Sequence, residues 1–166
     1  MLRTSMAKSY IKRTIRPLYG WTQMTPKSVF LDENFDRSVP IFPGMVCMRT
    51  RGENVTLIGT GGVPYGFSAL YVGGDGIDEP LDAGINAFAV WVMAPDAEAE
   101  VLAPAFDDTL TWTDPGDGTE LLVHASTSGA NRGKLVPAGS TNASTQPVAR
   151  LLKVNSATKI TIGGLR

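Results

Sequence analysis

The sequence predicts a mainly β protein, either a small β-barrel or a compact β-sandwich with long loops and an extended N-terminal arm. Short apolar runs of strand length recur between turns rich in glycine and proline. The chain has 18 glycines and 11 prolines among 166 residues, which is typical of loop-rich β proteins. It carries no long amphipathic helical pattern. These three observations together favour short strands joined by long connections.

The first 40 residues are predicted to form an extended basic arm, followed by a single β-rich domain at 41–166. Pro17, Gly20, Pro26 and Pro40 interrupt any long helical or strand pattern there. The segment combines basic side chains with spaced aromatic ones, a composition typical of a segment that packs on a partner. The residues expected to dock are Arg3, Lys8, Tyr10, Lys12, Arg13, Arg16, Tyr19 and Trp21.

Beyond the arm the pattern is that of β-strands. Residues 45–50 and 55–58 are expected to pair as a hairpin through the turn at 51–54. Residues 85–93 are apolar at nearly every position, which predicts a central strand buried on both faces.

The second half of the chain predicts further strands. Pro95 followed by acidic residues favours a single helical turn, while the end of that segment, up to residue 103, also fits a strand. Residues 109–113 alternate cleanly and are expected to pair with 119–126 across a glycine-rich turn. The last expected pair is a hairpin of residues 148–154 and 158–162 around a turn at 155–157.

The glycine-rich segment 59–76 raises the possibility of a phosphate-binding loop, and its details argue against one. It contains no lysine, which a P-loop requires, and Pro64 and Gly66 prevent a following helix. The acidic residues that come next would repel phosphate. We therefore predict a long connection whose apolar side chains pack on the body or on a neighbouring copy. These expected subunit-contact residues are Val63, Tyr65, Phe67, Leu70 and Tyr71.

No motif predicts catalysis, a cofactor or a metal. Cys47 lies in an apolar run and is expected to be a buried small hydrophobe, and a single histidine disfavours the usual zinc sites. A small β-barrel hydrolase using Ser68 and His124 is an alternative, although Leu70 replaces the second glycine of a nucleophile elbow. The acidic loops lack the spacing of a calcium loop and leave only a weak calcium site open. No apolar run reaches the length of a membrane-spanning helix.

The net charge of −1 conceals a separation into blocks. Residues 1–31 carry six basic side chains and no acid, residues 52–131 carry thirteen acids and no base, and residues 132–166 carry six bases and no acid. Such ends favour docking on a partner or on other copies, or else pairing of the acidic block with the chain's own basic C-terminal strands. The basic arm also leaves open a coat or scaffold-like virion protein that binds genome, which the acidic body disfavours.

Residues 40–95 resemble the capsid decoration, or cement, proteins of tailed bacteriophages. The resemblance rests on FPGMVCMRTRGENVTLIG at 42–59, VPYGFSALYVGGDGIDE at 63–79 and the apolar strand NAFAVWV at 86–92. It implies a small, β-rich, non-enzymatic virion protein, made in the host cytoplasm, that binds the outer surface of the head. It further implies the major capsid protein and neighbouring copies as partners, often as a homotrimer, with no membrane. The longer basic arm departs from the best-known small cement proteins and leaves the contacts of that arm open.

Overall fold

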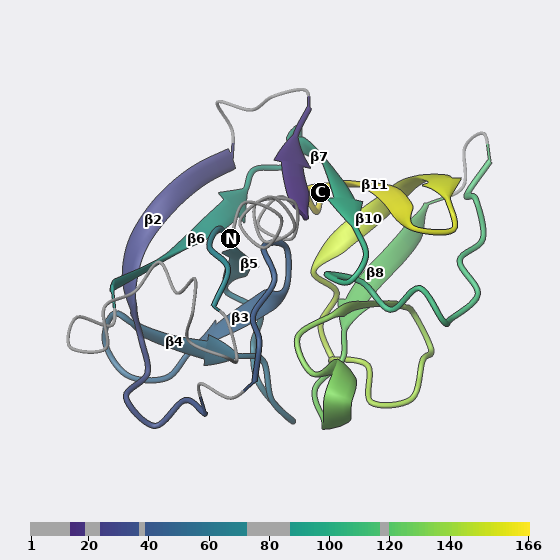
Figure 1. Cartoon of the computed structure of the whole chain (residues 1–166). Coiled ribbons are helices and arrows are strands. Elements are labelled where there is room, and N and C mark those ends of the chain that lie inside the picture. The colour runs from purple at the N-terminus through teal and green to yellow at the C-terminus, as the bar shows by residue number, and fades with distance from the viewer. Residues whose placement is uncertain (1–13, 19–23, 37–38, 73–86, 117–119) are drawn as a thin grey trace, which may run out of the picture.

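The computed structural model describes residues 14–18, 24–36, 39–72, 87–116 and 120–166 (Figure 1). These residues form two sheets that share one hydrophobic core. In Figure 1 the strands of the first sheet lie on the left and most strands of the second lie on the right. The mainly β prediction is confirmed, with one short 3-10 turn, η2 (Gly129–Asn131), among the described residues.

The first sheet closes into a ring in the order β2-β4-β3-β5-β6. Its β3–β4 hairpin, in which Cys47 pairs with Leu57, confirms the predicted hairpin. All neighbouring strands of the ring are antiparallel except β2 and β4. The ring strands are β2 (Met24–Leu31), β3 (Val46–Arg49), β4 (Asn54–Leu57), β5 (Gly66–Ser68) and β6 (Ala87–Met93).

The prediction that the strand at 85–93 is buried on both faces was wrong in part. In β6, Phe88 and Val90 are buried, whereas Ala89 and Trp91 are only partly covered. Since successive side chains of a strand point to opposite faces, the face that carries Phe88 and Val90 is buried and the opposite face is only partly covered.

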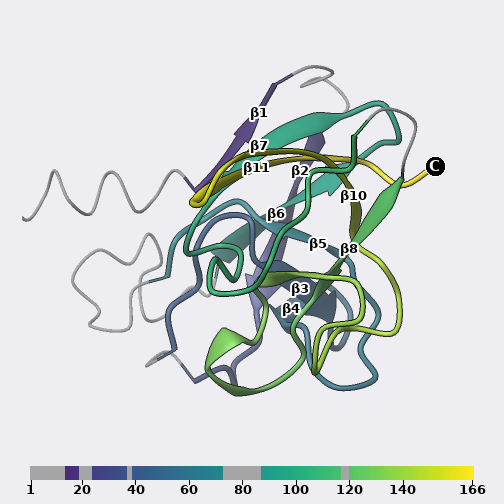
Figure 2. The same ribbon diagram turned by 90° about the vertical axis from the view of Figure 1, so that its right-hand side faces the viewer.

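The second sheet is antiparallel throughout, in the order β1-β7-β11-β10-β8-β9. Figure 2 shows β1, β7 and β11 side by side. The last hairpin, β10–β11, confirms the prediction and occupies the centre of the sheet. The strands are β1 (Ile15–Pro17), β7 (Glu98–Leu102), β8 (Leu121–Ala125), β9 (Leu135–Pro137), β10 (Ala149–Ser156) and β11 (Lys159–Gly163).

Residues 109–113 do not form the predicted strand, and β8 pairs with β9 and β10 instead. Trp112 is held in a loop because its indole Nε1 donates to the Asp107 carbonyl at 2.8 Å. The indole also meets the Phe106 ring edge-on, with centroids 5.4 Å apart. After Pro95 the chain makes one hydrogen-bonded turn, in which the Ala97 amide donates to the Ala94 carbonyl at 3.0 Å, and no helix continues from it. The strand expected at the end of that segment is confirmed by β7.

Two strands come from the segment that was expected to be an arm. β1 pairs with β7, and β2 pairs with β6 along its length from Met24 to Phe30. Pro17 is tolerated because β1 is an edge strand, where a missing N–H breaks no ladder. The division at residue 40 stays a prediction, but the strands β1 and β2 that lie before it belong to the two sheets.

Candidate interaction surface

The five predicted subunit-contact residues separate into an outward and an inward group. Val63 is 59% exposed, and Tyr65 is partly covered by the Arg49 guanidinium, which lies 5.1 Å from the ring centroid. Phe67 is 4% exposed and belongs to the core, because it lies on β5 inside the sheet. The structure therefore leaves Val63 and Tyr65 available for a contact and makes Phe67 a structural residue.

The remaining two residues of that prediction lie between these extremes. Leu70 packs against the core as a partly buried side chain. Tyr71 lies against Phe42, with ring centroids 5.4 Å apart. Both residues therefore contribute mainly to packing within the chain.

A shallow groove of about 350 Å³ lies beside Val63, and we call its lining the loop face. Arg49 forms one wall, and its Nη2 lies 3.4 Å from the Glu53 carboxylate. Gly62 is required here because a Cβ would lie 2.9 Å from the backbone oxygen of Gly59, as well as 2.5 Å from the Met48 sulfur. The glycine thus permits the tight turn that follows Gly59. The loop face consists of Met48, Arg49, Gly61, Gly62, Val63, Pro64 and Tyr65.

A second groove, of about 220 Å³, lies beside Phe67, between ring strands and segments of the C-terminal third. Phe67 and Met93 line it on the side of the ring. Pro147 and Leu165 line it from the other side, and Leu165 is 37% exposed. The groove is mainly apolar, and it adjoins the loop face because Tyr65 lines both.

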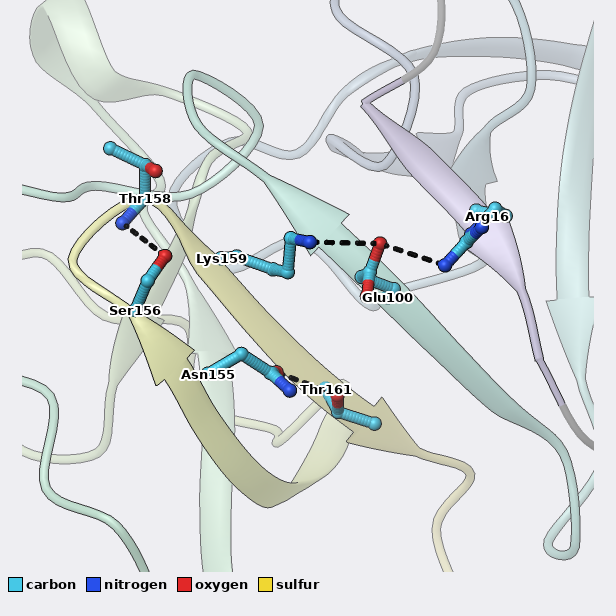
Figure 3. Close-up of polar contacts among 7 residues, drawn as sticks. All are labelled: Arg16, Glu100, Asn155, Ser156, Thr158, Lys159 and Thr161. Carbon is cyan, nitrogen blue, oxygen red and sulfur yellow. Dashed lines mark hydrogen bonds and ion pairs between the residues drawn. The ribbon is translucent and has the colours of Figure 1, made fainter.

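Of the predicted docking-arm residues, only Arg16 lies within the described part of the chain. Its Nη2 is 3.2 Å from the Oε1 of Glu100, and the Nζ of Lys159 is 3.7 Å from the same oxygen (Figure 3). Glu100 thus joins three neighbouring strands, β1, β7 and β11. The other predicted residues, Arg3, Lys8, Tyr10, Lys12, Arg13, Tyr19 and Trp21, lie outside the described residues.

The separated charge blocks meet inside the second sheet. The basic hairpin β10–β11 lies between β7 and β8, which come from the acidic block. Arg150 approaches Glu120 at 4.0 Å, and Lys159 approaches Glu100. For these residues the acidic block pairs with the chain's own basic strands, which was one of the two alternatives.

Arg132 has a role that sequence reasoning missed. Its Nε donates to the Ile58 carbonyl at 2.8 Å, and its Nη2 donates to the Leu57 carbonyl at 2.5 Å. Arg132 follows η2 in the loop between β8 and β9, so the guanidinium connects the second sheet to the end of β4. No local sequence signal marks a hydrogen bond over this separation.

The hydrolase alternative finds no support in the geometry. Ser68 is fully buried in the ring, and its hydroxyl donates to the Leu70 carbonyl at 2.6 Å. His124 lies in the second sheet, where its Nδ1 is 2.6 Å from the Ser144 carbonyl. Each of the two side chains contacts a nearby backbone carbonyl, in a different sheet from the other. They therefore do not form the nucleophile–base pair that hydrolysis needs.

The residues that the structure describes contain no cluster of three or more histidine, cysteine, aspartate or glutamate side chains suited to a metal ion. They also contain no helix long and apolar enough to cross a membrane.

Comparison with known proteins agrees with the resemblance noted in the sequence. No curated protein and no solved structure gave a significant match. The sequence model of one family, described as phage cement protein, matches residues 1–166. Because the match spans the whole chain, this protein belongs to the phage cement protein family.

Proposed function

We propose that this protein binds the outer surface of a phage capsid and stabilises the head lattice against the pressure of the packaged DNA. The observation that carries the proposal is the family match over the whole chain, since a cement protein has a structural, capsid-stabilising role. The engaged side chains of Ser68 and His124 fit a non-enzymatic role.

The loop face is the surface that we assign to contact with a neighbouring copy on the particle. Val63 projects an exposed apolar side chain beside a groove, and Arg49 adds a positive charge at its wall. In a homotrimer such a contact is heterologous and closes by rotation, so each copy uses the loop face once. Many weak contacts of this kind hold firmly on a lattice because the copies bind together.

The basic segment that precedes β1 is the part that we assign to the major capsid protein. Arg3, Lys8, Lys12 and Arg13 supply positive charge, and Tyr10 supplies an apolar anchor. Aromatic anchors and basic side chains are common at the centres and rims of protein interfaces. Tyr19 and Trp21, between β1 and β2, are assigned to the same contact.

A capsid-binding assay tests the proposal. Phage heads that lack this protein are incubated with the purified chain, sedimented, and analysed for bound copies per capsid subunit and for resistance to heating. We expect saturable binding and heads that withstand a higher temperature. Heads that bind no copies at micromolar concentrations of the chain would refute the proposal.

Matched variants in the same assay test the two assigned surfaces. Val63→Asp places a charge on the loop face and should weaken binding about tenfold or more, since burying a valine contributes about 1.5–3 kcal/mol. Ala157→Asp, at the exposed β10–β11 turn, is the control and should bind normally. Deletion of residues 1–13 should abolish stable binding while the far-UV circular dichroism spectrum is retained. Full affinity of the deletion variant would refute the role of the basic segment.

A further inference from the structure

The segment at residues 14–18 lies on the body as a short strand added to the edge of β7. The Leu18 amide donates to the Glu98 carbonyl, and the Leu102 amide donates to the Thr14 carbonyl, both at 2.8 Å. Residues 15, 16 and 17 pair with 101, 100 and 99 in antiparallel register. Among the described residues, β7 is the only strand that pairs with β1. This arrangement is that of a peptide bound by strand addition.

The body offers a shaped socket for one side chain of this segment. Ile15 is 9% exposed and packs beside Gly44, Val101 and Ala105. A Cβ on Gly44 would lie 3.3 Å from the Ile15 Cβ and 3.2 Å from that of Ala105. Gly44 also has φ +99°, a conformation that glycine adopts without strain. The turn that carries Gly44 is therefore built to admit the isoleucine.

Polar groups fix the position of the segment along β7. The Thr14 hydroxyl donates to the Pro43 carbonyl, and Thr14 is 3% exposed. On the outer side, Arg16 pairs with Glu100, whose side chain is 14% exposed and whose carboxylate is shared with Lys159 (Figure 3). The Ile15 socket, the hydrogen bonds of Thr14 and the charge of Glu100 all match this one short segment.

We propose that the edge of β7 is a strand-binding site between copies, in which residues 14–18 of one copy replace those of a second copy. The occupant that we assign is residues 14–18 of a second copy, because this segment of the same sequence has the side chains and the register that the site accepts. An exchanged strand regains the Ile15 socket, the Thr14 hydrogen bonds and the Arg16–Glu100 pair. The balance between the two arrangements is then set by the concentration of copies. This inference goes beyond capsid binding and does not depend on it.

Disulfide trapping in the full-length protein tests the exchange. Pro17 and Ala99 are directly opposite, and the neighbouring hydrogen bonds put them at a non-hydrogen-bonded position of the ladder. Such pairs lie close enough for a disulfide. Pro17→Cys and Ala99→Cys variants are mixed in a glutathione buffer and analysed on non-reducing gels and by mass spectrometry. Cys47 is fully buried and does not compete.

We expect a disulfide-linked heterodimer of Pro17→Cys with Ala99→Cys, with a yield that rises with protein concentration. The control is Pro17→Cys mixed with Ser156→Cys, whose cysteine lies exposed at the end of β10. The heterodimer yield should be at least about ten times that of this control. A yield equal to this control would overturn the proposal. The double variant Pro17→Cys/Ala99→Cys reports on the register, because it should close a disulfide at any dilution. Failure of both reactions would overturn the docking geometry itself.

Discussion

Replacing Arg132 by methionine should destabilise the protein more than any substitution of an exposed basic residue. Methionine keeps most of the apolar stem but removes the guanidinium. The carbonyls of Leu57 and Ile58 then lose the donors that reach them from the second sheet. Both residues are 0% exposed, so water has poor access to replace those donors. The prediction therefore concerns the connection between the ring and the second sheet.

The magnitude follows from the two hydrogen bonds. A hydrogen bond to a charged group contributes about 1.5–3 kcal/mol, and a buried acceptor left without a donor costs about 1–3 kcal/mol. Since Arg132 is only partly buried, we expect Arg132→Met to lower the free energy of unfolding by about 2–4 kcal/mol. For a chain of this size that corresponds to a Tm lower by about 5–15 °C. Arg132→Lys keeps one charged donor group, so its free energy of unfolding should lie between those of the unmodified protein and Arg132→Met.

Urea unfolding at pH 7, followed by tryptophan fluorescence and far-UV circular dichroism, measures this difference. Lys153→Met is the control, because Lys153 is an exposed basic residue on β10. The control should stay within about 0.5 kcal/mol of the unmodified protein. If the free energy of unfolding of Arg132→Met is also within about 0.5 kcal/mol of that of the unmodified protein, the guanidinium does not hold the two sheets together and the reasoning is refuted.

Three further predictions use the same unfolding assay. Phe67→Ala should cost about 3–5 kcal/mol because Phe67 is 4% exposed in the core, whereas Val63→Ala at the exposed loop face should cost less than about 0.5 kcal/mol; similar costs would contradict the inward placement of β5. Gly44→Ala should cost at least about 2 kcal/mol, since φ is +99° and a Cβ there meets neighbours at 3.2 Å, while Gly52→Ala, with φ +59° and open space, should cost about 1 kcal/mol; equal losses would exclude the tight socket. Burial raises the pKa of the Cys47 thiol to about 12, so the unfolded chain loses this proton at lower pH than the folded one, and stability should fall between about pH 9 and 12 by up to about 1.4 kcal/mol per pH unit. Cys47→Ala should lack that component, and an identical pH profile for the two proteins would show that the thiol is not held in its neutral form.

The hairpins were predictable because their signals are local. In both β3–β4 and β10–β11, two short apolar runs flank a turn, and the pairing residues lie close in sequence. The short strands β5 and β9, three residues each, are too brief for any periodicity to appear. β2 was missed for another reason, because residues 25–28 are all exposed and carry no alternation.

The alternation of apolar and polar residues at 109–113 led to a wrong strand prediction, because packing of the tryptophan side chain decides the local structure there. Leu110 and Trp112 alternate with polar residues as in a strand, yet the indole is fixed by Phe106 and the Asp107 carbonyl. At the loop face, the sequence indicated the apolar residues but not the placement of Arg49 over Tyr65. That contact joins β3 to the segment before β5, and it depends on how the ring closes.

The order of the second sheet has a consequence for synthesis on the ribosome. Its two central strands, β10 and β11, are translated after the strands that flank them. Until residue 163 has left the exit tunnel, β7 and β8 each have an unpaired edge, and Glu100 and Glu120 lack their partners Lys159 and Arg150. A chain interrupted before the last hairpin therefore cannot assemble this sheet, and its open strands would be a target for chaperones and proteases. The second sheet can therefore form only in chains that have been translated through β11.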